Sequence, residues 1–259
     1  MNGTMIAFSG KGGAGKTTTT AMMLRHLIRI GQKPILAVDA DPNATLALTL
    51  GVEPGGTIAD LRDKMGEAAA SDSSVPKDRL MNQYLAEVLE EHDGFDLLTM
   101  GRPEGPKCYC YVNGLLRRYL SLLRHNYAVV LVDCEAGMEY MSRLVVDDIE
   151  TLVLVAEPSP IGLTTIRRIY ELSESLNLKV GRRVVAVNKV PPTGAGAARE
   201  KLAGLDKLER IIEVPLDPDL AGRCTRGEPV DAQAGTVARA AIDELTRTAL
   251  GQAAVITRN

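Results

Sequence analysis

The chain has 259 residues, of which 45% are hydrophobic and 24% are charged, and its formal net charge is -3. This length and composition predict one large α/β domain spanning residues 1–259, with little length left for a second. The weakly acidic balance, the 3% of aromatic residues and the lack of an apolar run of ~18 residues argue against nucleic-acid and membrane partners. Because the N-terminus also lacks the layout of a signal peptide, we expect a cytoplasmic protein.

Strand-like and helix-like stretches alternate along the chain. Strands are predicted at residues 5–9, 34–39, 95–100, 128–133, 151–156, 184–188 and 210–214. Helices are predicted at residues 16–30, 79–91, 114–124, 161–176 and 236–250. Several strands are apolar throughout, which is typical of parallel strands buried on both faces. The sequence therefore predicts an α/β fold with a single doubly wound, mostly parallel sheet and helices on both faces, where ligands bind beyond the carboxyl ends of the strands.

A phosphate-binding loop, or P-loop, joins the first predicted strand to the first predicted helix. It consists of Gly10, Lys11, Gly12, Gly13, Ala14, Gly15, Lys16 and Thr17, and Thr18 follows it. In this motif the backbone N–H groups and the helix N-terminus surround a phosphate, Lys16 supplies a positive charge, and the Thr17 hydroxyl can ligate Mg²⁺. A merely structural Gly-rich turn is the alternative. The position between a strand and a helix favours a nucleotide site.

A second lysine, Lys11, distinguishes this loop from an ordinary P-loop, which needs no cation after its first glycine. The pattern Gly-Lys-Gly-Gly-x-Gly-Lys-Thr resembles the deviant Walker A loop of the superfamily that contains the nitrogenase iron protein, the partition ATPases and the septum-site ATPases. In that superfamily the extra lysine contacts the phosphates of the neighbouring subunit. The resemblance therefore implies a homodimer that binds ATP and ADP with Mg²⁺ and hydrolyses ATP. The alternative is that Lys11 is a solvated loop cation.

Carboxylates follow two of the predicted strands. Asp39 and Asp41 close the second strand, and the resemblance makes Asp41 the candidate general base and Asp39 a Mg²⁺-shell or switch residue. Helix capping before residues 43–50 is the alternative role for this pair. Asp133 ends the strand at 128–133 and is the candidate Walker B ligand of Mg²⁺. Glu135 and Gly137 then correspond to the second switch.

Two later segments are candidates for contact with the base. Asn188 and Lys189 end the strand at 184–188, and the resemblance implies that Asn188 hydrogen-bonds the adenine. Residues 214–218, which include Pro215 and Asp217, are similar to the superfamily's second base-contacting loop. Asp217 could equally cap a helix.

Cys108 and Cys110 form a candidate metal site. In an extended segment their two thiols project to the same side and can share one ion, but a structural zinc site needs four ligands. A twofold axis would supply the other two, and the resulting four-thiolate site suits Zn²⁺, Cu(I), an Fe–S cluster or Ni²⁺. The alternative is a pair of reduced core cysteines. Cys134, next to Asp133, is expected to be a small buried hydrophobic residue.

Residues 101–113 and 135–139 resemble the maturation ATPases of nickel carbon monoxide dehydrogenase. This resemblance implies a metallochaperone that holds Ni²⁺ or Zn²⁺ at its dimer interface and serves apo carbon monoxide dehydrogenase as its client. Three other functions remain open: an Fe–S carrier or scaffold, an electron-transferring reductase component, and a positioning ATPase of the partition and septum-site type. The Fe–S carriers usually show Cys-x-x-Cys, whereas this chain has Cys-x-Cys.

Overall fold

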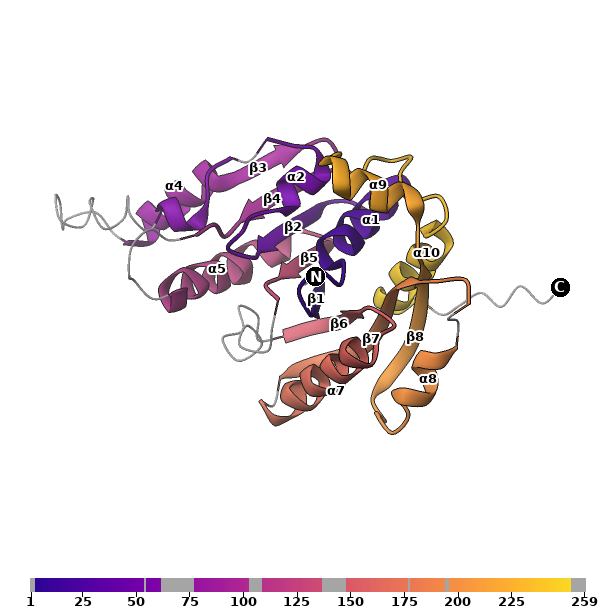
Figure 1. Cartoon of the computed structure of the whole chain (residues 1–259). Coiled ribbons are helices and arrows are strands. Elements are labelled where there is room, and N and C mark those ends of the chain that lie inside the picture. Colours follow the sequence, from indigo (N-terminus) through magenta and orange to yellow (C-terminus); the bar gives the residue numbers. More distant parts are fainter. Residues whose placement is uncertain are drawn as a thin grey trace.

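The computed structural model describes residues 3–53, 55–61, 77–102, 109–136, 148–176, 178–193 and 196–252. Within them, eight strands form one sheet in the order β3-β4-β2-β5-β1-β6-β7-β8 (Figure 1). The strands are β1 (Thr4–Gly10), β2 (Ile35–Ala40), β3 (Leu89–His92), β4 (Phe95–Thr99), β5 (Val129–Cys134), β6 (Asp148–Ala156), β7 (Lys179–Val190) and β8 (Leu208–Pro215). All neighbouring pairs are parallel except β3 and β4. The predicted sheet is therefore confirmed.

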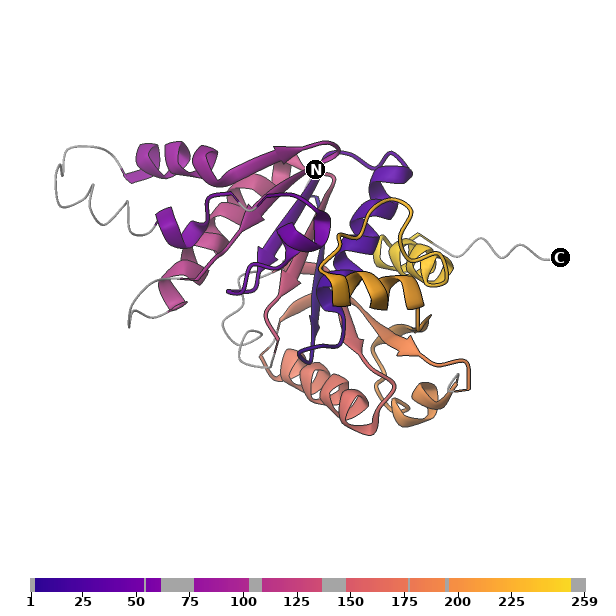
Figure 2. The same cartoon turned by 45° about the horizontal axis from the view of Figure 1, so that its top comes forward.

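Helices cover both faces of this sheet, as Figures 1 and 2 show. One face carries α4 (Lys77–Val88), α5 (Tyr109–Leu123), α7 (Pro160–Ser175) and α8 (Ala197–Lys201), and the other carries α1 (Lys16–Arg29), α2 (Leu46–Leu50) and α10 (Arg239–Ala249). A short 3-10 turn, η1 (Arg124–Asn126), follows α5, and the surface helix α9 (Pro218–Arg226) buries none of its residues. None of the helices so described is long and apolar enough to cross a bilayer.

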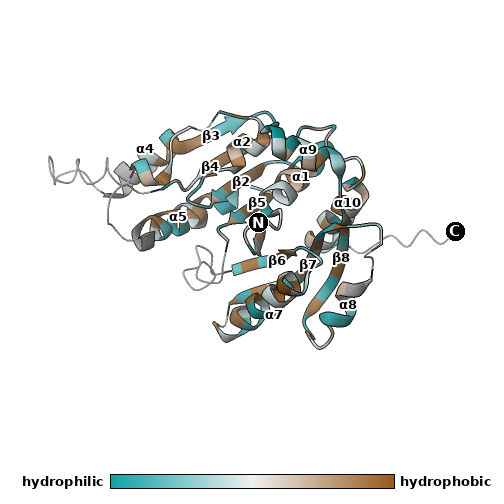
Figure 3. Ribbon diagram, in the orientation of Figure 1, coloured by the Kyte–Doolittle hydropathy of each residue, from teal (hydrophilic) through white to brown (hydrophobic). Residues whose placement is uncertain are grey.

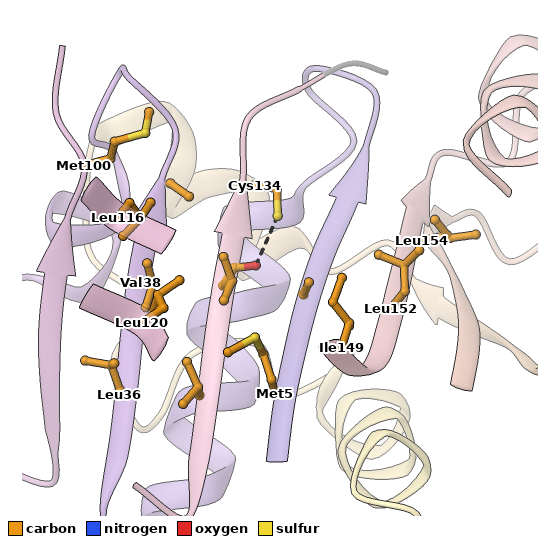
Figure 4. Packing of buried hydrophobic residues seen from close by; sticks show 14 of the residues in the cluster. Met5, Leu36, Val38, Met100, Leu116, Leu120, Cys134, Ile149, Leu152 and Leu154 are labelled. Atoms are coloured by element: carbon orange, nitrogen blue, oxygen red, sulfur yellow. Dashed lines mark hydrogen bonds between the residues drawn. The ribbon is translucent and has the colours of Figure 1, made fainter. Parts of the chain in front are cut away.

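The central strands divide their side chains between two apolar cores. In β1, Met5 and Ala7 belong to the core beneath α5 and α7, whereas Ile6 and Phe8 belong to the core beneath α1 and α10. Successive side chains of a strand point to opposite faces, so a strand covered on both faces must be apolar throughout. Figure 3 shows this as brown strands inside helices that carry teal outer faces, and Figure 4 shows part of the first core.

One predicted helix is wrong at its C-terminal end. The helix expected at residues 79–91 stops at Val88, and residues 89–92 form β3, which pairs antiparallel with β4. Asp93 and Gly94 make the two-residue turn between the two strands, with Gly94 at a left-handed φ of 90°. Only Gly94 of the two central residues has a positive φ, which glycine adopts readily. Asp-Gly between two strands is a strong signal for a tight hairpin turn. This local signal overrides the helical pattern before it.

A second correction concerns the start of α5. The helix begins at Tyr109 and not at the predicted residue 114, so Cys110 lies in its first turn and not in an extended segment. The apolar periodicity explains the longer helix, since it continues at helical spacing through the buried residues Val112, Leu115, Leu116, Tyr119, Leu120 and Leu123. Residues two apart do not face each other on a helix, so the alternation of an extended segment no longer places the Cys110 thiol beside that of Cys108. Cys108 lies outside the described residues.

Candidate nucleotide site

The P-loop lies at the carboxyl edge of the sheet, in its middle. Its strand, β1, pairs with β5 on one side and β6 on the other. A Cβ atom on Gly10 would lie 2.0 Å from the carbonyl oxygen of Val155, so only glycine fits at the start of the loop. Gly15 caps α1 with a left-handed φ of 92°, which again favours glycine. The loop therefore needs glycine at two positions for two different reasons: Gly10 lies against the Val155 carbonyl, and Gly15 has a left-handed backbone conformation.

The two lysines of the loop differ in burial. Lys16, the first residue of α1, is only 7% exposed, whereas Lys11 is exposed together with Gly12 and Gly13. A buried ammonium at the base of the loop is suited to a phosphate bound in the same chain. An exposed ammonium at its rim is suited to a ligand group that approaches from outside the chain, as predicted for Lys11.

Asp133 supplies an unpaired carboxylate below the loop. It is 1% exposed, and neither of its carboxylate oxygens has a hydrogen-bond partner among the described residues. Burial raises its pKa to about 7, and the nearby Thr17 hydroxyl offsets part of this rise without completing a hydrogen bond. Buried polar atoms without partners are rare and need an explanation. A hydrated Mg²⁺ between Thr17 and Asp133 fits this donor set, since Mg²⁺ is bound through few carboxylates and several waters.

Asp39 lies beside Asp133 on the neighbouring strand β2, in direct register. It is fully buried, and burial raises its pKa to about 6. One oxygen accepts the N–H of Asp41 at 3.1 Å, and the other accepts the N–H of Leu46 at 2.7 Å. Both oxygens therefore hold the loop that leads to α2. Of the two roles predicted for Asp39, Mg²⁺-shell residue and switch residue, this geometry supports the switch role.

Asp41 is half-buried at the start of that loop. Its Oδ1 atom accepts both the backbone N–H and the side-chain amide of Asn43, each at 2.9 Å. Ala44, in the same loop, has a left-handed φ of 51°, which non-glycine residues rarely adopt. No described residue donates to Oδ2 of Asp41, so this oxygen is the one that can accept a proton from water.

The predicted base-contacting residues lie against the P-loop. The side-chain amide of Asn188 donates to the carbonyl of Ala14 at 2.9 Å, and the ammonium of Lys189 donates to the carbonyl of Gly13 at 2.7 Å. Lys189 also forms an ion pair of 2.8 Å with Glu157, which follows β6. Sequence reasoning missed Glu157, because a single glutamate after a strand carries no motif. The topology alone brings it to the loop.

Asp217 has the capping role that was its alternative. One of its oxygens accepts the N–H groups of Asp219 and Leu220 at the start of α9, and the other accepts those of Val237 and Ala238. The residue is 4% exposed. Four backbone donors therefore occupy its carboxylate, which shapes the segment after Pro215 and offers no free oxygen to a base.

The segment predicted to form the second switch begins at Glu135 and Ala136, directly after β5, and a Cβ on Gly12 would contact the side chain of Ala136 at 3.6 Å. Gly137 and Cys108 lie outside the described residues. Within the described part of the chain, no group of three or more His, Cys, Asp or Glu side chains could hold a metal ion. Cys134 is buried in the apolar core of Figure 4, where burial raises the pKa of its thiol, so its predicted hydrophobic role is confirmed.

Residues 5–230 match the family model described as the CobQ/CobB/MinD/ParA nucleotide binding domain. The chain belongs to this family. With the P-loop geometry above, the predicted P-loop ATPase is confirmed at the level of the family.

The individual relatives of the chain are proteins of several kinds. The chain is 39% identical over 192 residues to an uncharacterized ATP-binding protein of Methanocaldococcus jannaschii, covering 73% of this chain and 75% of that one. It is 32% identical over 229 residues to the carbon monoxide dehydrogenase accessory protein CooC of Rhodospirillum rubrum, covering 82% and 83%. The MinD cell division protein of Aquifex aeolicus superposes with a TM-score of 0.70 at 24% identity, covering 98% and 100%, which shows a shared fold.

Proposed function

We propose that this protein is a homodimeric ATPase that assists nickel insertion into carbon monoxide dehydrogenase. The observation that carries the proposal is the similarity to CooC over most of both chains, in a chain that also has Lys11 and the Cys108–Cys110 pair. The topology supports it. Since β4 and β5 both run parallel to β2, the helix α5 between them starts near the carboxyl edge of the sheet, where the P-loop also lies.

The nucleotide chemistry follows from the residues of the loop. The backbone N–H groups and Lys16 bind the phosphates, and Lys11 reaches the phosphates held by a second copy. Oδ2 of Asp41 accepts a proton from the water that attacks the γ-phosphate, and the bond to the β-phosphate oxygen breaks to release ADP and phosphate. Magnesium, when bound beside Thr17 and Asp133, neutralises charge on the phosphates.

Metal transfer is coupled to this reaction through the strand ends. Asp39 ties the loop of Asp41 to β2, and Glu135 continues β5 beside the P-loop, so loss of the γ-phosphate changes both segments. In the proposed dimer, Cys108 and Cys110 of both copies hold one ion, which is cargo and not a resident cofactor. The coupling must be reciprocal: if bound nucleotide changes the affinity for the metal ion by some factor, the bound metal ion changes the affinity for nucleotide by the same factor.

The deciding experiment is a titration of the reduced full-length protein with Ni²⁺ and with Zn²⁺, with the oligomeric state followed by light scattering. We expect one tight ion per two chains and stabilisation of the dimer by the ion. The double variant Cys108→Ser/Cys110→Ser should lose this ion, and the control Cys224→Ser, which alters an exposed cysteine, should keep it. One ion per monomer, or retention by the double variant, would contradict the proposal.

A positioning ATPase is the second candidate, and the fold similarity to MinD favours it. It predicts that ATP recruits the protein to anionic lipid vesicles or to DNA. Cosedimentation with vesicles of phosphatidylglycerol in the presence of MgATP, without a stoichiometric metal, would support this candidate over the first. A brown chromophore in the purified protein would instead support an Fe–S carrier.

A further inference from the structure

A bulge near the C-terminal end of β7 directs two neighbouring side chains toward the P-loop. The register of β7 against β8 shifts between Val187 and Val190, so that Asn188 and Lys189 lie opposite one residue of β8, Val214. Lys189 has a left-handed φ of 59°. In a regular strand two successive side chains point to opposite faces, whereas a bulge with such a residue can re-aim one of them. Both side chains here reach the same loop.

The two side chains hold two successive peptide groups of that loop. Asn188 donates to the carbonyl of Ala14 at 2.9 Å, and Lys189 donates to the carbonyl of Gly13 at 2.7 Å. Because a peptide group is planar, a fixed carbonyl also fixes the N–H group on the same plane. The N–H group of Gly15 is therefore oriented from β7, and so is that of Ala14, which donates to the backbone carbonyl of Lys11 at 3.2 Å and so sets the shape of the loop.

The contact is built tightly on both sides. A Cβ atom on Gly15 would lie 2.3 Å from the amide nitrogen of Asn188, so the close approach requires glycine. On the other side, Glu157 accepts from the Lys189 ammonium at 2.8 Å and keeps it beside the loop. The Lys189 ammonium thus has two acceptors, the Gly13 carbonyl and the Glu157 carboxylate, which together fix its position. A solvated lysine would lose more side-chain entropy when it made the contact to the loop.

We propose that Lys189 is a positioning residue of the P-loop, and that Glu157 orients it. Lys189 acts on the phosphate site through the Gly13 carbonyl and not through contact with the base. Its contribution is therefore the same for any ligand that places a polyphosphate in the loop. The inference rests on nucleotide binding by this family and not on the proposed metal transfer, so failure of the metal titration leaves it standing.

The test compares ligands with and without a nucleoside. Lys189→Met in the full-length protein should raise the Kd for MgADP and the KM for ATP about tenfold, because a hydrogen bond from a charged donor is lost. The inhibition constant of magnesium tripolyphosphate, which has no base or ribose, should rise by the same factor. The kcat at saturating ATP should change less than about threefold, because the loop binds the ground state and transition state alike.

Three further variants sharpen the result. Lys189→Gly removes the side chain but suits the left-handed backbone, so it should match Lys189→Met without risk to folding. Lys189→Arg keeps the positive charge and should recover most of the affinity. Lys207→Met is the matched control, because Lys207 pairs with Glu174 on another surface and should leave every constant unchanged.

Two results would overturn the inference. In the first, Lys189→Met weakens ADP binding while the inhibition constant of tripolyphosphate stays at the parental value, which would place Lys189 at the nucleoside. In the second, neither Lys189→Met nor Lys189→Gly changes any constant, which would make the bulge a feature of the sheet alone. Glu157→Gln should weaken both ligands by about twofold, as expected for a half-exposed ion pair.

Discussion

Asn43 donates two hydrogen bonds to a single oxygen of Asp41, one from its backbone N–H and one from its side-chain amide, each 2.9 Å long. This arrangement orients the carboxylate and leaves Oδ2 to water. We expect Asp41→Asn to bind ATP with near-parental affinity and to hydrolyse it ~10²–10⁴-fold more slowly, because a positioned general base is lost. Single-turnover phosphate release measures this directly. Unchanged hydrolysis would leave Asp41 as a structural residue of the loop.

Lys16→Ala should abolish ATP hydrolysis while the fold remains intact. The reason is the position of the ammonium, which is buried at the first residue of α1, directly at the phosphate loop. Circular dichroism would verify the fold, and steady-state phosphate release would verify the loss. Lys179→Ala is a suitable control, since Lys179 is exposed at the opposite end of β7. Parental turnover by the Lys16 variant would remove this lysine from the mechanism.

Lys11→Gln should retain ADP binding by the monomer and lose dimer formation with ATP. Lys11 is exposed at the rim of the loop, so its removal leaves the buried phosphate contacts in place. Light scattering with and without MgATP would follow the dimer, and a phosphate assay would follow the accompanying fall in hydrolysis. If the variant dimerises normally with ATP, Lys11 has no role across the subunit boundary.

Stability should depend on pH through Asp133. Its pKa is about 7 in the folded protein and close to the ordinary value of 3.8 in the unfolded chain. The folded state therefore binds the proton more tightly, and the stability from this group is complete below about pH 4 and is lost as the pH rises toward 7. The loss is at most about 4 kcal/mol. Asp39 contributes in the same direction, with a pKa of about 6.

This dependence can be measured by urea unfolding in EDTA. Asp133→Asn has no charge to bury, so it should be more stable than the parent at pH 8 and of similar stability at pH 4. Added Mg²⁺ and ADP should narrow the difference at pH 8, since a cation favours the ionised carboxylate. A constant stability difference between parent and variant across this range would show that Asp133 keeps an ordinary pKa.

The sheet could be predicted from the sequence because its central strands are apolar throughout, as residues 129–132 show. The edge was harder to predict. The hairpin of β3 and β4 depends on the pair Asp93 and Gly94, a local turn signal that follows directly on a helical pattern. The predicted start of α5 at residue 114 is too late, since Gly114 lies on the exposed face of a helix whose buried face continues on both sides of it.

The site could be predicted where one short motif contains both the reactive residue types and the spacing between them. Residues 10–17 and the carboxylates at strand ends meet this condition. Two features of the site do not: the ion pair between Glu157 and Lys189, and the engagement of both Asp39 oxygens by backbone N–H groups. The first depends on which strands become neighbours and the second on how a loop folds back, and neither leaves a pattern of residue types in the sequence.

The distance along the chain between the P-loop and its supports has a consequence for synthesis. The hydrogen bonds from Asn188 and Lys189 to the loop span 174 and 176 positions, although the motif itself ends at Thr17. A growing polypeptide therefore carries the complete motif long before it carries these two supports of the loop. We expect a fragment that ends before residue 188 to have the signature of an ATPase and to bind ATP more weakly than the full chain.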